Sequence, residues 1–287
     1  MSGTIILGYD VETASDNTAG FLEGAERLHD KYEVPWTIYL TGATLESRVD
    51  DVRRVQGNPL MAIGQHTFNH VLLKSVYMMP GDGKPVHGAA PNFFKQGGAL
   101  EQVREEIERT QRLMRDLLGM ECRGLTGPWG YYRGLLDRTD ILQILQDVGI
   151  QWIRTYARDF RDCQPTPFSV QPFFYADQGF DDILELGIQG YQDDFYWERF
   201  DDRRYGKTYQ DYLYAMLEEV ARRDWVWNIC SHDHGTQTVE MFDETKGKWM
   251  EDMILRARDL GIRFVSPVDF YEEMKGKAGR VELAPAV

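Results

Sequence analysis

Short, strongly apolar segments alternate with amphipathic segments along nearly the whole 287-residue chain. The apolar segments carry hydrophobic side chains at both odd and even positions, which is typical of strands that are covered on both faces. Such strands are predicted at residues 4–11, 34–40, 60–65, 124–126, 151–156, 183–188, 225–230 and 262–265. A parallel sheet with helices outside it buries strands of this kind.

The segments between the predicted strands repeat their apolar residues with the period of an amphipathic helix. Helices are predicted at residues 19–31, 98–118, 138–147, 208–223, 246–259 and 268–275. Gly119, Gly149 and Gly261 stand where a residue with left-handed backbone commonly ends a helix. The alternation of strand and helix predicts an α/β fold, either a parallel barrel or an open sheet.

No low-complexity linker divides the chain, and this predicts one domain over residues 1–287. Two segments interrupt the alternation. Residues 71–97, with three prolines and four glycines, are too long for an ordinary connection and predict a long loop over the site. Residues 189–205 mix aromatic side chains with both signs of charge and are interpreted as a second rim or lid, and the tail at 281–287 is expected to be loose.

The formal net charge of −14 disfavours nucleic acid and anionic membranes as partners, because both call for a basic face. No signal peptide is visible, and no segment approaches the roughly 18 apolar residues of a membrane span. Cys122, Cys163 and Cys230 lack the spacing of a disulfide framework or a thiolate zinc site. A cytoplasmic protein with reduced thiols is expected.

Histidines are scarce, with six in the chain, and two of them follow a predicted strand directly. In GQHTFNH, the spacing of four places His66 and His70 on one side if the chain turns into a helix there, which suits two ligands of one metal ion. The alternative is a pair of polar residues at a strand end. His29 falls on a predicted helix as an expected surface residue, and His87 falls in the long loop, where a solvated role is expected.

Two other predicted strands also end in groups that can bind metal or transfer protons. Asp10 and Glu12 share one face at the end of the first strand, and His232 and His234 follow the apolar segment WVWNIC. The carboxyl ends of parallel strands meet at one edge, where barrel active sites gather. A carboxylate with two imidazoles can hold a divalent ion, and a second carboxylate and a third imidazole can then act as base and acid.

The ordered motifs YDVE, HTFNH, GPWG and ICSH, together with PWTIYLTG at 35–42, resemble those of the polysaccharide deacetylases, the NodB-homology proteins of carbohydrate esterase family 4. The resemblance spans about residues 4–270. It implies a single-domain, distorted (β/α)7-type barrel with long rim loops. It also implies hydrolysis assisted by a divalent metal ion, with zinc expected.

The resemblance assigns roles residue by residue. Asp10 matches the catalytic base, Glu12 with His66 and His70 matches the metal ligands, His232 matches the general acid, and the backbone amide of Trp129 matches an oxyanion donor. The substrate contacts are predicted to be Tyr131, Arg154 and His234. Thr126 stands where the family has an arginine that orients the base, and Arg123, Arg133 and Arg154 are the candidates to replace it.

The missing signal peptide and the long loop favour a cytoplasmic, allantoinase-like or small-amide branch of the family. The predicted activity is hydrolysis of a non-peptide C–N bond in a small amide or N-acetylated substrate. Three alternatives stay open: a metal-independent amidohydrolase, a deacetylase of polysaccharides or N-acetyl sugars, and a non-catalytic metabolite-binding relative. Assembly into a homo-oligomer also stays open.

Overall fold

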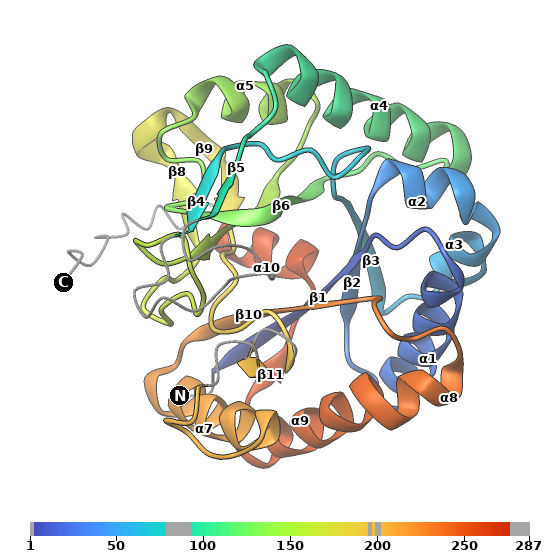
Figure 1. Cartoon of the computed structure of the whole chain (residues 1–287), viewed down its shortest axis with the longest axis vertical. Coiled ribbons are helices and arrows are strands. Elements are labelled where there is room, and N and C mark those ends of the chain that lie inside the picture. Colours follow the sequence, from blue (N-terminus) through green and yellow to red (C-terminus); the bar gives the residue numbers. More distant parts are fainter. Residues whose placement is uncertain (1–2, 79–92, 195–196, 199–201, 276–287) are drawn as a thin grey trace.

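The structure is a computed structural model that describes residues 3–78, 93–194, 197–198 and 202–275. Strands occupy its centre and helices surround them (Figure 1). The nine-stranded main sheet has the order β10-β1-β2-β3-β6-β7-β9-β8, and β11 pairs with β1. Every pairing in it is parallel except β8 with β9. The α/β prediction is confirmed.

The strands of the main sheet are β1 (Thr4–Val11), β2 (Trp36–Leu40), β3 (Met61–Gln65), β6 (Gly124–Tyr132), β7 (Trp152–Arg158), β8 (Phe173–Tyr175), β9 (Phe180–Glu185), β10 (Val226–His232) and β11 (Arg263–Phe264). A separate hairpin contains β4 (Val76–Met78) and β5 (Phe93–Lys95). The helices are α1 (Asp16–Tyr32), α2 (Gly42–Ser47), α3 (Val49–Gln56), α4 (Leu100–Leu118), α5 (Thr139–Asp147), α7 (Tyr209–Arg223), α8 (Val239–Phe242), α9 (Lys248–Asp259) and α10 (Pro267–Met274), with a 3₁₀ turn η1 (Ala176–Gln178) and a π-helical turn η2 (Asp243–Gly247).

In the described part of the chain, β9 and β10 are not paired by a ladder of backbone hydrogen bonds. Hydrogen bonds that involve side chains connect the segment after β9 to β10 instead. The backbone N–H of Asn228 donates to Gln189 Oε1 at 2.8 Å, and the Asn228 amide donates to the Gly187 carbonyl at 2.7 Å. The Trp227 indole donates to the Gln189 carbonyl at 3.0 Å. This seam is where the sheet departs from a regular barrel.

Strand β1 is buried along its whole length, and its two faces meet different surroundings. The odd residues Ile5, Leu7 and Tyr9 belong to the hydrophobic cluster that contains the apolar face of α1. The even residues point the other way, because side chains alternate along a strand. A Cβ atom on Gly8 would lie 2.2 Å from the guanidinium of Arg154. Glycine at position 8 therefore makes room for Arg154 below Asp10.

The predicted helix ends and most strand positions agree with the structure. Gly119, Gly149 and Gly261 have φ angles of +66°, +82° and +71°, as predicted for residues that end helices. The sequence interpretation did not include β4, β5, β8, α2, α3 or α8. The long segment at 71–97 contains the β4–β5 hairpin in its described part, whereas His87 and the tail at 281–287 lie outside the described residues.

His29 was predicted to be a surface residue, and this prediction is wrong. Its side chain has no exposed area and stacks on Trp36 with ring centroids 5.1 Å apart. One ring nitrogen lies 2.9 Å from the Val34 carbonyl and the other 2.9 Å from the Tyr9 hydroxyl. Burial lowers the pKa of His29 to about 3, although the hydrogen bond to Val34 opposes this shift.

We expect His29 to make the protein less stable in mild acid. The unfolded chain binds a proton near pH 6.5 and the folded one only near pH 3, so stability from this group is present above pH 6.5 and is lost as pH falls. Between pH 7 and pH 5 the loss from this group is about 2 kcal/mol. Urea unfolding of the wild type and His29→Gln at both pH values measures it. Equal pH dependence in the two proteins contradicts the expectation.

None of the helices in the described ranges combines the length and the hydrophobicity that a membrane span requires.

Candidate active site

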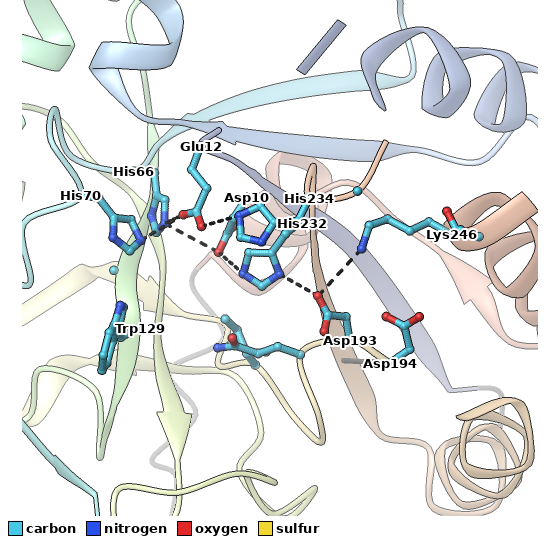
Figure 2. Close-up of a pocket in the computed structure, with 15 residues that line it drawn as sticks. Asp10, Glu12, His66, His70, Trp129, Asp193, Asp194, His232, His234 and Lys246 are labelled. Carbon is cyan, nitrogen blue, oxygen red and sulfur yellow. Dashed lines mark hydrogen bonds and ion pairs between the residues drawn. The ribbon is translucent and has the colours of Figure 1, made fainter. Parts of the chain in front are cut away.

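Three strand ends bring the predicted site residues together at the carboxyl edge of the sheet (Figure 2). β10 and β3 lie on the two sides of the β1–β2 pair, and Asp10 is the direct register partner of His232. Asp10, Glu12, His66, His70 and His232 all line one pocket of about 650 Å³. The predicted convergence of the three clusters is confirmed.

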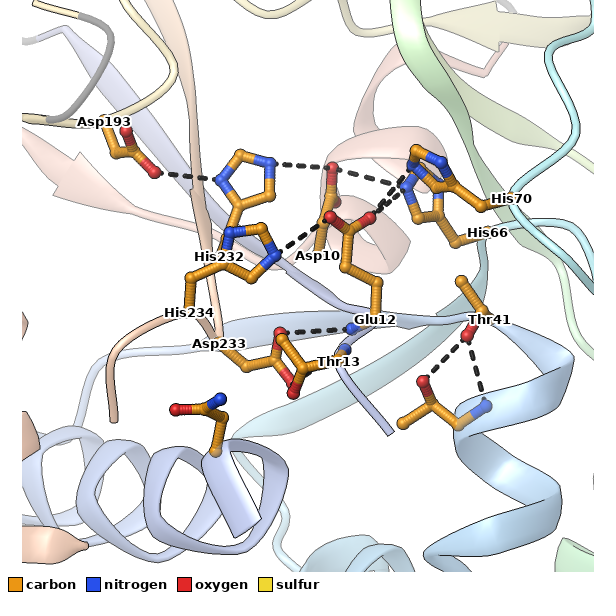
Figure 3. A network of polar contacts seen from close by, with 12 residues as sticks. Asp10, Glu12, Thr13, Thr41, His66, His70, Asp193, His232, Asp233 and His234 are labelled. Atoms are coloured by element: carbon orange, nitrogen blue, oxygen red, sulfur yellow. Dashed lines mark hydrogen bonds and ion pairs between the residues drawn. The ribbon is translucent and has the colours of Figure 1, made fainter. Parts of the chain in front are cut away.

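Glu12 lies at the centre of three imidazoles. Its Oε2 atom is 3.1 Å from His66 Nε2 and 3.0 Å from His70 Nε2, and its Oε1 atom is 3.1 Å from His234 Nε2 (Figure 3). Burial opposes ionisation of Glu12, but hydrogen bonds from the three imidazoles outweigh it and lower its pKa below the ordinary value. Glu12 is therefore a carboxylate at neutral pH.

The chain between His66 and His70 is a loop rather than the helical turn on which the grouping of the two rings was made conditional. Thr67 and His70 both have φ angles of +58°, and hydrogen bonds from Gly42 and Ala43 hold the carbonyls of residues 67 and 68. The two rings still meet edge to face, with centroids 4.7 Å apart. Two residues with left-handed backbone thus bring the rings together without a helical turn.

Glu12, His66 and His70 offer a set of donors that fits a divalent ion. Their donor atoms, one carboxylate oxygen and two imidazole nitrogens, lie within 4.8 Å of one another. Catalytic zinc sites commonly have three such ligands and an open fourth position. His66 Nδ1 is 2.9 Å from the Thr126 carbonyl, which holds a proton on that nitrogen and leaves Nε2 facing the ligand set.

Asp10 is almost completely buried beside these ligands and has two differently placed oxygens. Its Oδ2 atom lies 3.9 Å from His66 Nε2 and 4.0 Å from His232 Nε2, and it accepts a hydrogen bond from the Cys230 thiol at 3.4 Å. Its Oδ1 atom lies 3.5 Å from a guanidinium nitrogen of Arg154. Asp10 thus faces the pocket with one oxygen and a buried cation with the other.

Arg154 is the arginine that lies beside Asp10, at the level of Thr126. Its guanidinium has no exposed area and lies 4.4 Å above the Tyr39 ring. Arg154 on β7 is the register partner of Thr126 on β6, so the cation comes from the neighbouring strand at the same level. Arg123 instead pairs with Glu272 on the outside of the molecule. Of the three candidates, Arg154 is the one with an ion pair to Asp10.

His232 is paired with a carboxylate that the sequence interpretation did not identify. Its Nδ1 atom lies 2.9 Å from Asp193 Oδ2, and Lys246 Nζ lies 4.0 Å from the same oxygen. Burial lowers the pKa of His232, but the hydrogen bond and the charge of Asp193 outweigh it and raise the pKa to about 9. His232 is protonated at neutral pH, with Nε2 on the side of Asp10 (Figure 3).

Asp233 positions the loop that carries Glu12. Its carboxylate accepts hydrogen bonds from the backbone amides of Glu12 and Thr13, both at 3.2 Å. It also accepts from the hydroxyls of Thr13 and Thr18, at 2.7 and 2.8 Å. Four donors from one loop and the first turn of α1 therefore converge on this buried side chain.

The remaining predicted residues divide into two groups. Trp129, in a left-handed backbone conformation with φ of +69°, lines the pocket, and so does His234. Tyr131 is buried outside the pocket lining, with its hydroxyl accepting from the Leu73 amide at 2.7 Å. Arg154 is also buried and outside the lining, so neither of these two side chains is placed for the predicted substrate contact.

The fold and the site define an α/β protein with a carboxylate–imidazole centre at the carboxyl edge of a mostly parallel sheet. The sequence profile of the polysaccharide deacetylase family matches residues 3–153, and the chain belongs to this family. No curated protein sequence matches the chain.

Several solved structures share the fold. A proposed polysaccharide deacetylase from Mycobacterium smegmatis is 12% identical with a TM-score of 0.63, covering 96% of this chain and 91% of its own. An allantoinase is 11% identical with a TM-score of 0.63, and the match covers 94% of this chain and 90% of the allantoinase. A third structure is a mutant, with restored enzymatic activity, of a carbohydrate esterase family 4 pseudoenzyme from Bacillus anthracis. It is 13% identical with a TM-score of 0.54, and the match covers 95% of this chain and 68% of the pseudoenzyme.

Proposed function

We propose that the protein is a metal-dependent hydrolase of non-peptide C–N bonds that acts on small amide or N-acetylated substrates. The observation that carries this proposal is the placement of the Glu12–His66–His70 donor set beside Asp10 and His232 in one pocket. A divalent ion held by these three ligands, with zinc expected, supplies Lewis acidity toward water and the substrate carbonyl.

Asp10 accepts the proton of the attacking water in this mechanism. Its Oδ2 atom faces both the ligand set and His232, whereas the buried guanidinium of Arg154 fixes the other oxygen. Arg154 is therefore a positioning residue in this proposal rather than a substrate contact.

His232 donates a proton to the leaving nitrogen. The hydrogen bond to Asp193 holds its ring in place and keeps it protonated at neutral pH. Proton transfer by such positioned side chains accelerates reactions by about 10²–10⁴-fold. The backbone amide of Trp129, at the pocket wall, is assigned to the oxyanion that develops on the carbonyl.

The size of the pocket supports a small substrate. Its volume of about 650 Å³ falls within the range of roughly 300–1,000 Å³ that is usual for small-molecule sites. The fold is shared with an allantoinase as well as with polysaccharide deacetylases, so the fold alone does not choose between the two substrate classes.

A substrate panel tests the proposed function. Protein stripped with a chelator and protein reloaded with one equivalent of zinc are incubated with ureides, cyclic imides, N-acetyl amino acids, N-acetyl sugars and chitin oligomers. Release of ammonia or acetate is measured. We expect turnover of a small amide or N-acetyl compound by the zinc-loaded protein alone.

Each other outcome contradicts a stated part of the proposal. Equal turnover without metal indicates a metal-independent amidohydrolase, and faster turnover of the chitin oligomers indicates a polysaccharide deacetylase. Zinc binding without turnover of any compound indicates a binding relative.

A further inference from the structure

Strand β10 places a cysteine directly below the proposed general acid. Cys230 and His232 are two residues apart, so both side chains point to the same face of the strand. In the register with β1, Cys230 pairs with Gly8 and His232 pairs with Asp10. The thiol is fully buried and donates to Asp10 Oδ2 at 3.4 Å. The mechanism proposed above gives this thiol no proton-transfer role.

Asp10, Cys230 and His232 together form a second group of donor atoms. The carboxylate oxygen, the sulfur and the imidazole nitrogen lie within 4.8 Å of one another, and all three residues are buried. Thiolate, imidazole and carboxylate are the three ligand types that zinc prefers. We propose that these residues form a second binding site for a soft divalent cation such as Zn²⁺, next to the Glu12–His66–His70 set.

Small movements are sufficient to close this group around an ion. Tetrahedral zinc with ordinary bond lengths separates its ligand atoms by about 3.3–3.6 Å. The sulfur already lies 3.4 Å from Asp10 Oδ2, and His232 Nε2 lies 4.0 Å from the same oxygen. Asp10 and His232 line the pocket, which gives the ion a route from solvent.

The burial and the charge around each site determine the order in which the two sites fill. All three donor residues of the Cys230 site are buried, whereas Glu12 and His70 are partly exposed at the pocket. The guanidinium of Arg154, 3.5 Å from Asp10 Oδ1, leaves Oδ2 available but adds a positive charge that weakens the binding of a cation beside it. The Glu12 site therefore fills first, and the Cys230 site fills at higher metal concentration.

An ion at the second site inhibits the enzyme, and this consequence rests on the proposed function. The ion binds Asp10 Oδ2 and displaces the proton of His232 Nε2, so Asp10 can no longer accept a proton and His232 can no longer donate one. Zinc is therefore both the expected cofactor at one equivalent and an inhibitor in excess.

Cobalt titration tests the site without any substrate. Metal-free protein is titrated with cobalt(II) chloride, and the absorption spectrum is followed. We expect weak visible bands with the first equivalent and a sulfur-to-cobalt charge-transfer band in the near ultraviolet with the second. The Cys122→Ala/Cys163→Ala double variant keeps Cys230 as its one cysteine and should retain this band. Cys230→Ser, with a hydroxyl in place of the thiol, should lose it.

The inhibition is measured with excess zinc chloride, each protein being compared with its own rate at one equivalent. Because even indirect metal partners change affinity by about 10–100-fold, Cys230→Ser should raise the half-inhibiting zinc concentration roughly tenfold or more. The absence of the charge-transfer band in the wild type, or its loss in the double variant, overturns the site. Equal inhibition of wild type and Cys230→Ser overturns the regulatory role. If the wild type shows the charge-transfer band but hydrolyses no compound of the panel, the second metal site is supported and the proposed function is contradicted.

Discussion

Replacing His66 with alanine is expected to abolish both divalent-ion binding and hydrolysis. His66 supplies one of three donor atoms in the Glu12–His66–His70 set, and its ring is held by the Thr126 carbonyl at 2.9 Å. Loss of an indirect metal partner already lowers affinity by about 10–100-fold, so loss of a direct ligand should lower it further. Metal analysis after gel filtration and kcat/KM on the best substrate of the panel measure the two effects.

His234→Ala is the matched control for this variant. His234 also contacts Glu12, at 3.1 Å, but it does not belong to the donor group and its side chain is 58% exposed. We expect His234→Ala to retain one equivalent of zinc. His66→Ala should remain folded, with a stability loss of about 1–3 kcal/mol because the Thr126 carbonyl loses its partner. Full zinc content and full activity in folded His66→Ala would rule out the proposed metal centre.

Much of the site could be predicted because strand geometry is simple. Side chains alternate along β1, so Asp10 and Glu12 share a face, and parallel strands align their carboxyl ends. These two rules bring the side chains of β1, β3 and β10 together in the order that the structure shows. The resemblance added the roles, which geometry by itself does not supply.

Strand geometry could not predict the pairing of Asp193 with His232 or the choice of Arg154 among the three arginines, and the reasons differ. Asp193 lies in an irregular segment after β9, and its approach to His232 depends on how that segment crosses the seam to β10. Arg154 was one of three candidates, and the choice depends on the β6–β7 register that pairs it with Thr126. A register is set by tertiary packing, so the sequence left the three arginines equivalent.

His29 shows the opposite case, because its burial was present in the pattern. The buried apolar residues of α1 include Phe21, Leu22, Ala25 and Leu28, and position 29 continues the same helical stripe. The polar identity of the residue suggested the surface, whereas its spacing indicated the core. Tyr9 and the Val34 carbonyl satisfy both ring nitrogens, which allows a histidine at that position.

Asp10→Asn is expected to separate proton transfer from metal binding. The substitution keeps the shape of the side chain but removes the base, so kcat/KM should fall by about 10²–10⁴-fold. The donor set of Glu12, His66 and His70 is untouched, and one equivalent of zinc should still bind. Asp182→Asn is the matched control, because Asp182 accepts a hydrogen bond from Gln146 at an exposed position away from the pocket.

The stability of Asp10→Asn also tests the role of Arg154. The buried guanidinium loses its charged partner in this variant, and breaking a buried ion pair commonly costs about 3–5 kcal/mol. Urea unfolding measures this cost, and thermal unfolding identifies the temperature range in which the variant is folded. Within that range, we expect Asp10→Asn to bind zinc but to be inactive, and His66→Ala to bind no zinc. These two results together would assign proton transfer to Asp10 and metal binding to His66. A zinc-loaded Asp10→Asn protein with wild-type kcat/KM would instead assign the role of base to another group that lines the pocket.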